Sequence, residues 1–168
     1  MENVTLPSGR EVQIRSIRPA DAEPLRAAYA RLSPQSKYRR FLAPKPYLTS
    51  SDTRYLVHVD GHDHVALVAT PADDPAWILG VARFVRLPED PELAELAVVV
   101  GDPFRREGLA TALLVRLAQA AVQRGVRRFR GTMLAQNEPA DRLVRGAAAG
   151  SVRVRSLGSV KELEIELA

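Results

Sequence analysis

ELAVVVGDPFRREGLAT, residues 95–111, is the stretch that decides the fold. Its first part, ELAVVV (95–100), lacks the polar alternation of a half-exposed strand and is typical of a central strand buried on both faces. The loop GDPFRREG leads into residues 109–125, where apolar side chains recur with the 3.6-residue period of an amphipathic helix. Gly125 ends this pattern, where a left-handed residue closes a helix. The stretch therefore predicts a buried strand, a loop and a long helix in succession.

Outward from this centre, helices and strands follow each other in both directions. Before it, apolar periodicity and turn residues predict a strand over 10–18, helices over 21–32, 33–42 and 49–59, and strands over 64–70 and 76–87. Asp21 and Thr49 are expected to cap two of these helices. After it, the pattern predicts a strand over 127–135, a helix over 138–149, and closing strands over 151–156 and 160–167. Turn-joined strands and a strand–helix–strand unit occur together, which predicts an α/β class with a mixed sheet, in one domain over residues 1–168.

Length and composition narrow the function classes. The 168 residues are 46% apolar and 26% charged, which suits one globular domain. There is no cysteine, so disulfides, thiolate metal sites and a cysteine acyl relay are excluded. No apolar run could span a bilayer and the first residues lack a signal-peptide core, so we expect a soluble, cytoplasmic protein without a membrane partner.

The chain is basic, and its basic residues are mostly arginine. The net charge is +4, from 21 Arg and 3 Lys against 20 acidic residues. Arginine binds phosphate with two parallel hydrogen bonds, so the excess could serve nucleic acid, a phosphorylated cofactor or an acidic partner. A GC-rich genome also produces this composition without any such role. The acids are interspersed and aromatic residues are few, and the RRFR segment (127–130) is expected to face solvent or acidic groups, so no nucleic-acid partner is expected.

The start of the long helix is a candidate anion site. Gly108 and Ala110 keep its first turn free of bulk, so a ligand can approach the backbone closely. Free N–H groups and the positive end of the helix dipole favour negative charge there, and Arg105 and Arg106 add formal charge. The glycine spacings of the dinucleotide fingerprint and of the P-loop are both absent. The residues alone therefore indicate a phosphate-bearing ligand of another kind.

This segment resembles motif A of the GNAT superfamily of acyl-CoA N-acyltransferases, whose pattern is Gln/Arg-x-x-Gly-x-Gly/Ala after a central strand. Arg105, Gly108 and Ala110 occupy its three defining places, and MLAQNEPADRLVRGAAAG (133–150) is similar to the family's next strand, its Asn and a helix ending in Gly. With the order of the upstream elements, the resemblance covers nearly the whole chain. RPADAEPLRAAYARLSPQSKYRRFL (18–42) and ELAVVV are most similar to the catalytic domain of bacterial protein-lysine acetyltransferases. The resemblance implies a mostly antiparallel mixed sheet flanked by helices, with an acyl-CoA cleft where the central strand splays from its neighbour.

The resemblance also implies roles for particular residues. The cofactor would be acetyl-CoA, used as co-substrate. Its pantetheine arm would meet the strand backbone at Val98, Val99 and Val100, and would bond to Asn137. The pyrophosphate would lie in the loop and first helical turn made by Arg105, Arg106, Glu107, Gly108, Leu109, Ala110 and Thr111. The valines would serve equally as plain core packing.

Glu95 is the candidate general base. It precedes the apolar run, where the resembling subfamily uses a Glu. A lysine amine has a pKa near 10.4, so freeing it at neutral pH costs about 4.6 kcal/mol, and a carboxylate can take its proton as attack proceeds. Glu92 and Glu89, in or beside the preceding turn, are the alternatives, and surface acids are ordinary there.

Two departures from the family concern the last helix. Many members carry a Tyr there that protonates the leaving thiolate, but here Leu143 is followed by Val144. A thiol with a pKa near 8.5 leaves acceptably as its anion, so such an acid is helpful rather than mandatory. Many members also end this helix with Gly-Phe, whereas Gly150 is followed by Ser151.

A metal site at His58, His62 and His64, with Asp60 and Asp63 between them, is the other candidate constellation. Polar residues are expected in a turn that enters a strand, and no further ligand cluster is present, so no metal is expected.

The predicted function is acetyl transfer from acetyl-CoA to a protein lysine, directly in a ternary complex. An acyl-CoA synthetase is one candidate acceptor. In the subfamily that the chain resembles, this domain is often fused to a regulatory or acyl-CoA-synthetase-like domain. Two alternatives stay open: an acetyltransferase of a small amine or N-terminal amine, and a CoA-binding regulatory domain with weak catalysis.

Overall fold

A computed structural model describes residues 1–41, 45–104, 107–134 and 151–167. Within these residues, eight strands form one sheet in the order β1-β2-β3-β4-β5-β6-β8-β7. The strands are β1 (Glu2–Thr5), β2 (Glu11–Ser16), β3 (His64–Pro71), β4 (Gly80–Leu87), β5 (Asp90–Val100), β6 (Arg128–Leu134), β7 (Val152–Leu157) and β8 (Val160–Glu166). β5 and β6 pair in parallel and the other neighbours are antiparallel, which confirms the predicted mixed sheet.

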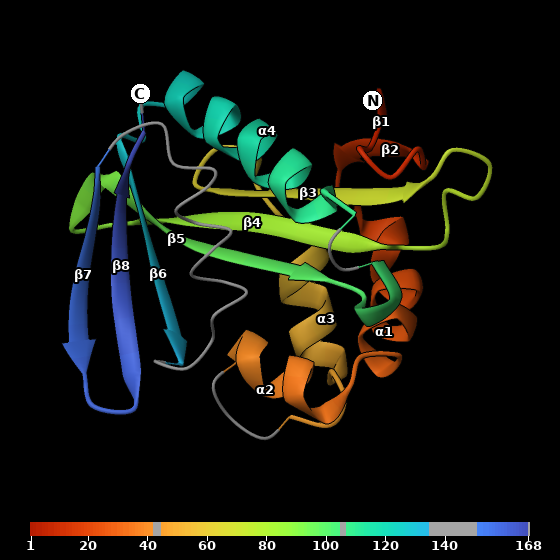
Figure 1. Cartoon of the computed structure of the whole chain (residues 1–168), viewed down its shortest axis with the longest axis horizontal. Coiled ribbons are helices and arrows are strands. Elements are labelled where there is room, and N and C mark those ends of the chain that lie inside the picture. Colours follow the sequence, from red (N-terminus) through yellow and green to blue (C-terminus); the bar gives the residue numbers. More distant parts are fainter. Residues whose placement is uncertain (42–44, 105–106, 135–150, 168) are drawn as a thin grey trace.

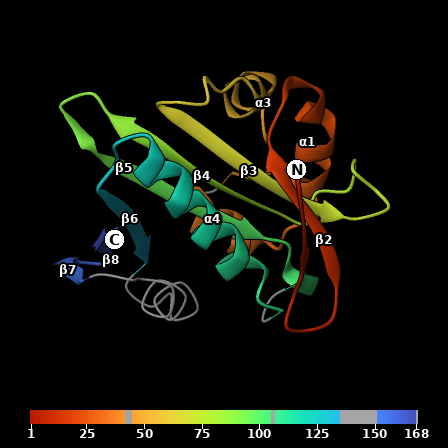
Figure 2. The same cartoon turned by 90° about the horizontal axis from the view of Figure 1, so that it is seen from above.

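Helices cover both faces of the sheet (Figures 1 and 2). The long helix α4 (Leu109–Gln123) lies across β3, β4 and β5 on one face. The helices α1 (Ala22–Ala30), α2 (Pro34–Phe41) and α3 (Ser50–Val57) lie on the other. All four were predicted from the sequence within a few residues. Two short 3-10 helices, η1 (Pro19–Asp21) and η2 (Asp102–Phe104), precede α1 and follow β5.

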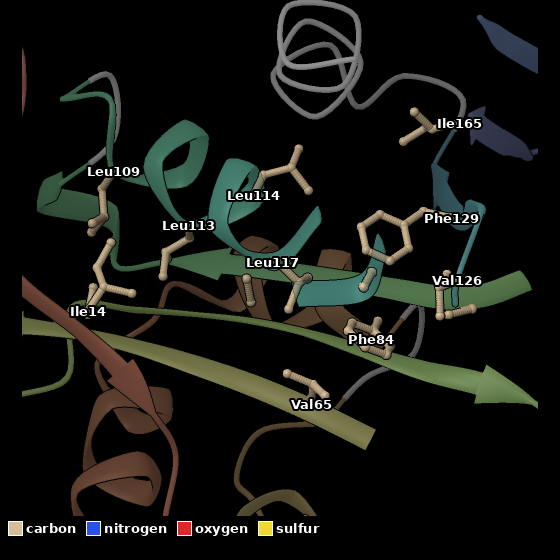
Figure 3. Packing of buried hydrophobic residues seen from close by; sticks show 14 of the residues in the cluster. Ile14, Val65, Phe84, Leu109, Leu113, Leu114, Leu117, Val126, Phe129 and Ile165 are labelled. Atoms are coloured by element: carbon tan, nitrogen blue, oxygen red, sulfur yellow. The ribbon is translucent and has the colours of Figure 1, made fainter. Parts of the chain in front are cut away.

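The larger apolar cluster lies under α4 (Figure 3). Leu109, Leu113 and Leu117 project from one side of the helix, at the spacing of its apolar stripe, and are almost fully buried. They pack on the strands, where Phe84 and Phe129 bring their rings to 5.7 Å between centroids. A second cluster lies between the sheet and α1–α3. β5 contributes Val98 and Val100 to the first cluster and Val99 to the second, so its alternating side chains serve both faces.

The structure adds one strand to those predicted and moves the start of another. Strand β1 was not predicted, yet it forms a hairpin with β2 through a turn in which Gly9 has a φ of 92°. β5 begins at Asp90 rather than at residue 95, because its hairpin with β4 already pairs Leu87 with Asp90. Pro91 is tolerated at this first part of the strand because few ladder bonds are needed there.

The two expected helix caps have different outcomes. The hydroxyl of Thr49 accepts a hydrogen bond from the Asp52 N–H, and the Asp52 carboxylate accepts one from the Thr49 N–H, so the predicted cap is confirmed as a capping box. Asp21 stands at the N-cap of α1 but does not cap it. Its carboxylate instead forms a buried ion pair with Arg15 at 2.8 Å and accepts the Arg18 N–H.

The predicted helix over 138–149 lies outside the described residues, and the other predicted elements are present. In the described ranges, no helix combines the length and apolar character needed to cross a membrane.

Candidate active site

The parallel strands β5 and β6 pair over only three positions. The pairs are Leu93 with Arg128, Ala94 with Phe129, and Glu95 with Arg130. Beyond Glu95, β5 keeps its pairing with β4, while β6 keeps the pairing with β8 that its other edge makes over its whole length. Figure 1 shows β6 running away from β5 at a steep angle. In the described part of the chain no strand pairs with this side of β5 after Glu95, so the fork between the strands begins at that residue.

Glu95 is the acidic residue at the fork. It is the sixth residue of β5, not the first as the sequence indicated, because the strand begins at Asp90. Its side chain is 59% exposed, and its Oε1 accepts a hydrogen bond from Arg130 Nη2 at 3.0 Å. Glu92 lies three positions earlier, in the irregular part of β5 between Asp90 and Ala94 where the register with β4 shifts. Glu89 lies in the β4–β5 turn. Of the three acids, Glu95 is the one at the last β5–β6 pair.

Val98, Val99 and Val100 follow the fork on β5. They pair with Ala82, Val81 and Gly80 of β4. Their side chains are committed to the two apolar clusters, so what they offer a ligand is backbone on the side away from β4. An unpaired strand edge can bind an extended ligand by main-chain hydrogen bonds.

The strand edge leads to the first turn of α4. Gly108 is the N-cap residue, with a φ of 87°, and its carbonyl accepts the first intrahelical bond from the Ala112 N–H. The amides of Leu109, Ala110 and Thr111 therefore precede the helical hydrogen-bond ladder. Buried Leu109 anchors this turn in the core, whereas Thr111 is exposed. The geometry suits an anion, because open amides and the helix dipole act together.

Glu107 makes structural contacts within the chain. Its carboxylate accepts hydrogen bonds from Arg10 Nε at 2.7 Å and from the Ser8 hydroxyl at 3.1 Å, and the bond from Arg10 lowers its pKa. It thus ties the start of α4 to the β1–β2 turn. Arg105, Arg106, Asn137 and Val144 lie outside the described residues.

A buried cation near the fork was missed by the sequence reasoning. Arg83 of β4 lies almost fully buried on the face that carries α1–α3. Its Nη1 donates to the Leu56 carbonyl at 2.9 Å and lies 3.0 Å from His64 Nε2. Burial and the charge of Arg40 lower the pKa of Arg83 to about 9, so it stays charged at neutral pH. Burial and the charge of Arg83 lower the pKa of His64 to about 4, which leaves its imidazole neutral. The available signal was Arg83 in the middle of the apolar first part of this strand, GVARF (80–84).

The three histidines of the alternative metal site have separate partners. His58 Nδ1 contacts the Arg54 carbonyl, His62 Nδ1 contacts Asp63, and His64 contacts Arg83. Across the described ranges, no group of three metal-ligating side chains comes together.

The RRFR segment has acidic partners, as expected. Arg128 bridges Asp90 and Glu164, both at 2.8 Å, while Arg130 lies between Glu95 and Glu162. These arginines are therefore neutralised within the sheet.

Comparison with known proteins decides the family. The model of the acetyltransferase (GNAT) family matches residues 26–147, which include the fork and the start of α4. This chain belongs to the acetyltransferase (GNAT) family. The chain has the fold of that family: a mixed, mostly antiparallel sheet that does not close.

Individual relatives agree with this assignment. The chain is 33% identical over 136 residues to "Acetyltransferase Pat" of Mycolicibacterium smegmatis, and the match covers 80% of this chain and 40% of the relative. The GNAT domain of S. lividans PAT superposes with a TM-score of 0.90 at 32% identity, over 99% of this chain and 96% of that one. A Salmonella typhimurium acetyltransferase, yncA, solved with its cofactor acetyl-CoA, shares the fold at a TM-score of 0.74 and 16% identity, over 94% of each chain. The chain thus spans less than half the length of the curated relative Pat.

Proposed function

We propose that this acetyltransferase moves the acetyl group of acetyl-CoA to the side-chain amine of a protein lysine. The observation that carries the proposal is the end of the β5–β6 ladder at Glu95. It puts a carboxylate at the point where an unpaired strand edge begins, and that edge leads to the open amides of α4. The resemblance to the catalytic domain of protein-lysine acetyltransferases, and the relatives named Pat and PAT, support lysine as the acceptor.

In this proposal the cofactor lies along the fork. The backbone of Val98–Val100 would hydrogen-bond the pantetheine arm, with Asn137 as a further partner. The first turn of α4, from Gly108 to Thr111, would hold the pyrophosphate, with Arg105 and Arg106 beside it. The positive end of α4 and its open amides fit a pyrophosphate without any metal ion.

The reaction requires the protein to accept one proton, that of the attacking amine. The acceptor amine attacks the thioester carbonyl carbon, so a C–N bond forms and the C–S bond then breaks. Glu95 takes the proton that the attacking nitrogen loses, directly or through water. Coenzyme A leaves as a thiolate, for which a protonating residue is helpful but not mandatory. Arg130, 3.0 Å from Glu95, positions the carboxylate at the fork.

A time course of CoA release tests the proposal. The protein is incubated with acetyl-CoA and a lysine-bearing protein, with small amines, or with neither, and acetylated lysines are located by mass spectrometry. Release that depends on the lysine-bearing protein supports the proposal. Release only with small amines or with a free N-terminus would reassign the acceptor. Binding of acetyl-CoA without any transfer would instead indicate a regulatory domain.

A further inference from the structure

Positive charge is concentrated in one segment of the chain. Residues 24–51, which contain most of α1 and all of α2, hold six basic side chains and no acidic one. The other 18 basic residues are outnumbered by the 20 acidic ones, so the rest of the chain has a net charge of −2. The excess charge of the whole molecule therefore comes from the helices on one face of the sheet.

Most of these cations are not neutralised within the fold. In the described part of the chain, Arg26 and Lys45 pair with a carboxylate, whereas Lys37, Arg39 and Arg40 of α2 do not. Burial lowers the pKa of Arg40, which lies beside the ring of Phe41. A partly buried cation without an anion is costly, so a negative group from outside the chain would be bound favourably here.

Another cation, Arg83, lies on the sheet face that α1–α3 cover. Arg83 opposes Ala97 on β5, and Glu95 opposes Val85 on β4. Arg83 and Glu95 are thus diagonal neighbours on one face of the β4–β5 ladder, with Cα atoms about 7–8 Å apart. Arg83 has no carboxylate partner among the described residues, and as a buried charge it is weakly screened by salt. If the acceptor lysine of a bound polypeptide is at Glu95, an anion on this face would belong to a residue one or two positions from that lysine in the polypeptide.

The same region carries the exposed tyrosines. Tyr38, Tyr47 and Tyr55 lie on α2, after it and on α3, and are between 40% and 66% exposed. Tyrosine and arginine together are typical of surfaces that bind polypeptides. Helix α2 is itself fixed to the segment that follows β5, because Asp102 of η2 accepts hydrogen bonds from the Ser33 N–H and the Ser36 hydroxyl.

We propose that α2, with Arg39 and Arg40, binds acidic side chains that flank the acceptor lysine of a polypeptide, while the buried charge of Arg83 beneath α2 adds positive potential without touching the ligand. This rests on the proposed function, since Glu95 marks the place of the amine. Single-stranded nucleic acid could also be held by arginine and tyrosine. The position of Arg83, diagonal to Glu95 on the β4–β5 ladder, favours the polypeptide.

Two peptides test the proposal. Both have a blocked N-terminus and one central lysine, flanked by Glu and Asp in one and by Gln and Asn in the other. Binding is measured by fluorescence anisotropy in the presence of CoA, and transfer is measured as kcat/KM with acetyl-CoA. One exposed charge pair changes affinity by up to about fivefold, so two or more pairs predict a preference of about tenfold for the acidic peptide at low salt. The preference should shrink at high salt.

Variants locate the site. Arg39→Gln and the double change Arg39→Gln/Arg40→Gln should reduce the acidic preference without altering kcat/KM for the neutral peptide. The matched control is Arg153→Gln/Arg155→Gln, which removes the same charge from exposed positions on β7 and should keep the preference. Thermal melts check that each variant is folded. If the double variant does not fold, the single Arg39 variant still tests the proposal.

The outcomes separate this inference from the proposed function. Equal kcat/KM for both peptides, or equal losses in the α2 and β7 variants, would overturn the acidic site and leave lysine acetylation standing. Preferential binding of the acidic peptide without transfer would overturn the proposed function alone. Tight binding of a single-stranded oligonucleotide, lost in the α2 variants and not displaced by the acidic peptide, would assign the surface to nucleic acid and overturn the proposal.

Discussion

At the scale of single residues, Glu95 is placed by strand pairing rather than by burial. It lies at the last β5–β6 pair, exposed, with Arg130 as its partner. If it takes the proton of the attacking amine, Glu95→Gln keeps the shape and hydrogen bonding but removes the basicity. We expect kcat to fall by about 100- to 10,000-fold, with unchanged acetyl-CoA affinity. Steady-state kinetics and calorimetric titration measure the two quantities.

The matched control is Glu92→Gln, which removes an exposed carboxylate from the irregular first part of the same strand. It should leave kcat nearly unchanged. A similar kcat in both variants would remove Glu95 from the base role.

Gly108 is required by the backbone at the start of α4. Its φ is 87°, and an added Cβ would lie 2.7 Å from Cδ of Pro7. Gly125 has a similar φ of 84° but nothing within 4 Å of such a Cβ. Gly125→Ala should cost only the left-handed backbone strain, about 1–2 kcal/mol of unfolding free energy. Gly108→Ala should cost more because the clash is added. Urea unfolding of both variants compares them, and equal losses would contradict the close packing on Pro7.

At the scale of elements, the first turn of α4 is the proposed pyrophosphate site. Ala110→Asp would put a negative charge among the open amides that precede the helical ladder. We expect acetyl-CoA affinity to fall by at least about tenfold, because like charges would meet at the site. The control is Gln119→Asp, which puts the same charge at an exposed position later in the same helix. Equal affinities of the two variants in a calorimetric titration would move the pyrophosphate elsewhere.

Elements with a strong local pattern were predictable from the sequence, and those defined by distant partners were not. The apolar stripe of α4 and the Thr49–Asp52 capping box are local, and both are confirmed. The early start of β5 depends on its hairpin with β4, and the bond from Arg130 to Glu95 joins residues 35 positions apart. Likewise Asp21 has the sequence of a helix cap, but the buried guanidinium of Arg15 binds its carboxylate instead. Pairing partners of this kind cannot be read from a single segment.

At the scale of the whole molecule, His64 links stability to pH. Its pKa is about 4 in the folded chain and about 6.5 when unfolded, so the unfolded state binds more protons between these values. The stability from the neutral imidazole is full above pH 6.5 and is lost as the pH falls toward 4. His64→Gln keeps an acceptor for Arg83 without the titration. We therefore expect the melting temperature of the wild type to drop more between pH 7 and pH 5 than that of the variant.

The acids give a separate pH window. Hydrogen bonds and ion pairs lower the pKa values of Asp52, Asp60 and Glu107 below their ordinary values of 3.8 to 4.5. Their stabilisation is lost only as the pH falls below about 4.5, so it does not mask the effect of His64. An equal drop in the wild type and the His64 variant between pH 7 and pH 5 would contradict the buried neutral imidazole.

The arrangement of the whole molecule also predicts the kinetic order of the reaction. The proposed cofactor path follows the β5 edge to α4, while the proposed acceptor surface lies over the α1–α3 face, and the two meet at Glu95. Both substrates can therefore be bound at once. Since the chain has no cysteine and no recognisably activated serine or lysine, nothing favours a covalent acyl-enzyme. We expect intersecting double-reciprocal plots when both substrates are varied, and no labelled protein after incubation with radiolabelled acetyl-CoA alone. Parallel plots, together with a stable acyl adduct at one residue, would require the acetyl group to stop on the enzyme and would replace direct transfer by a two-step route.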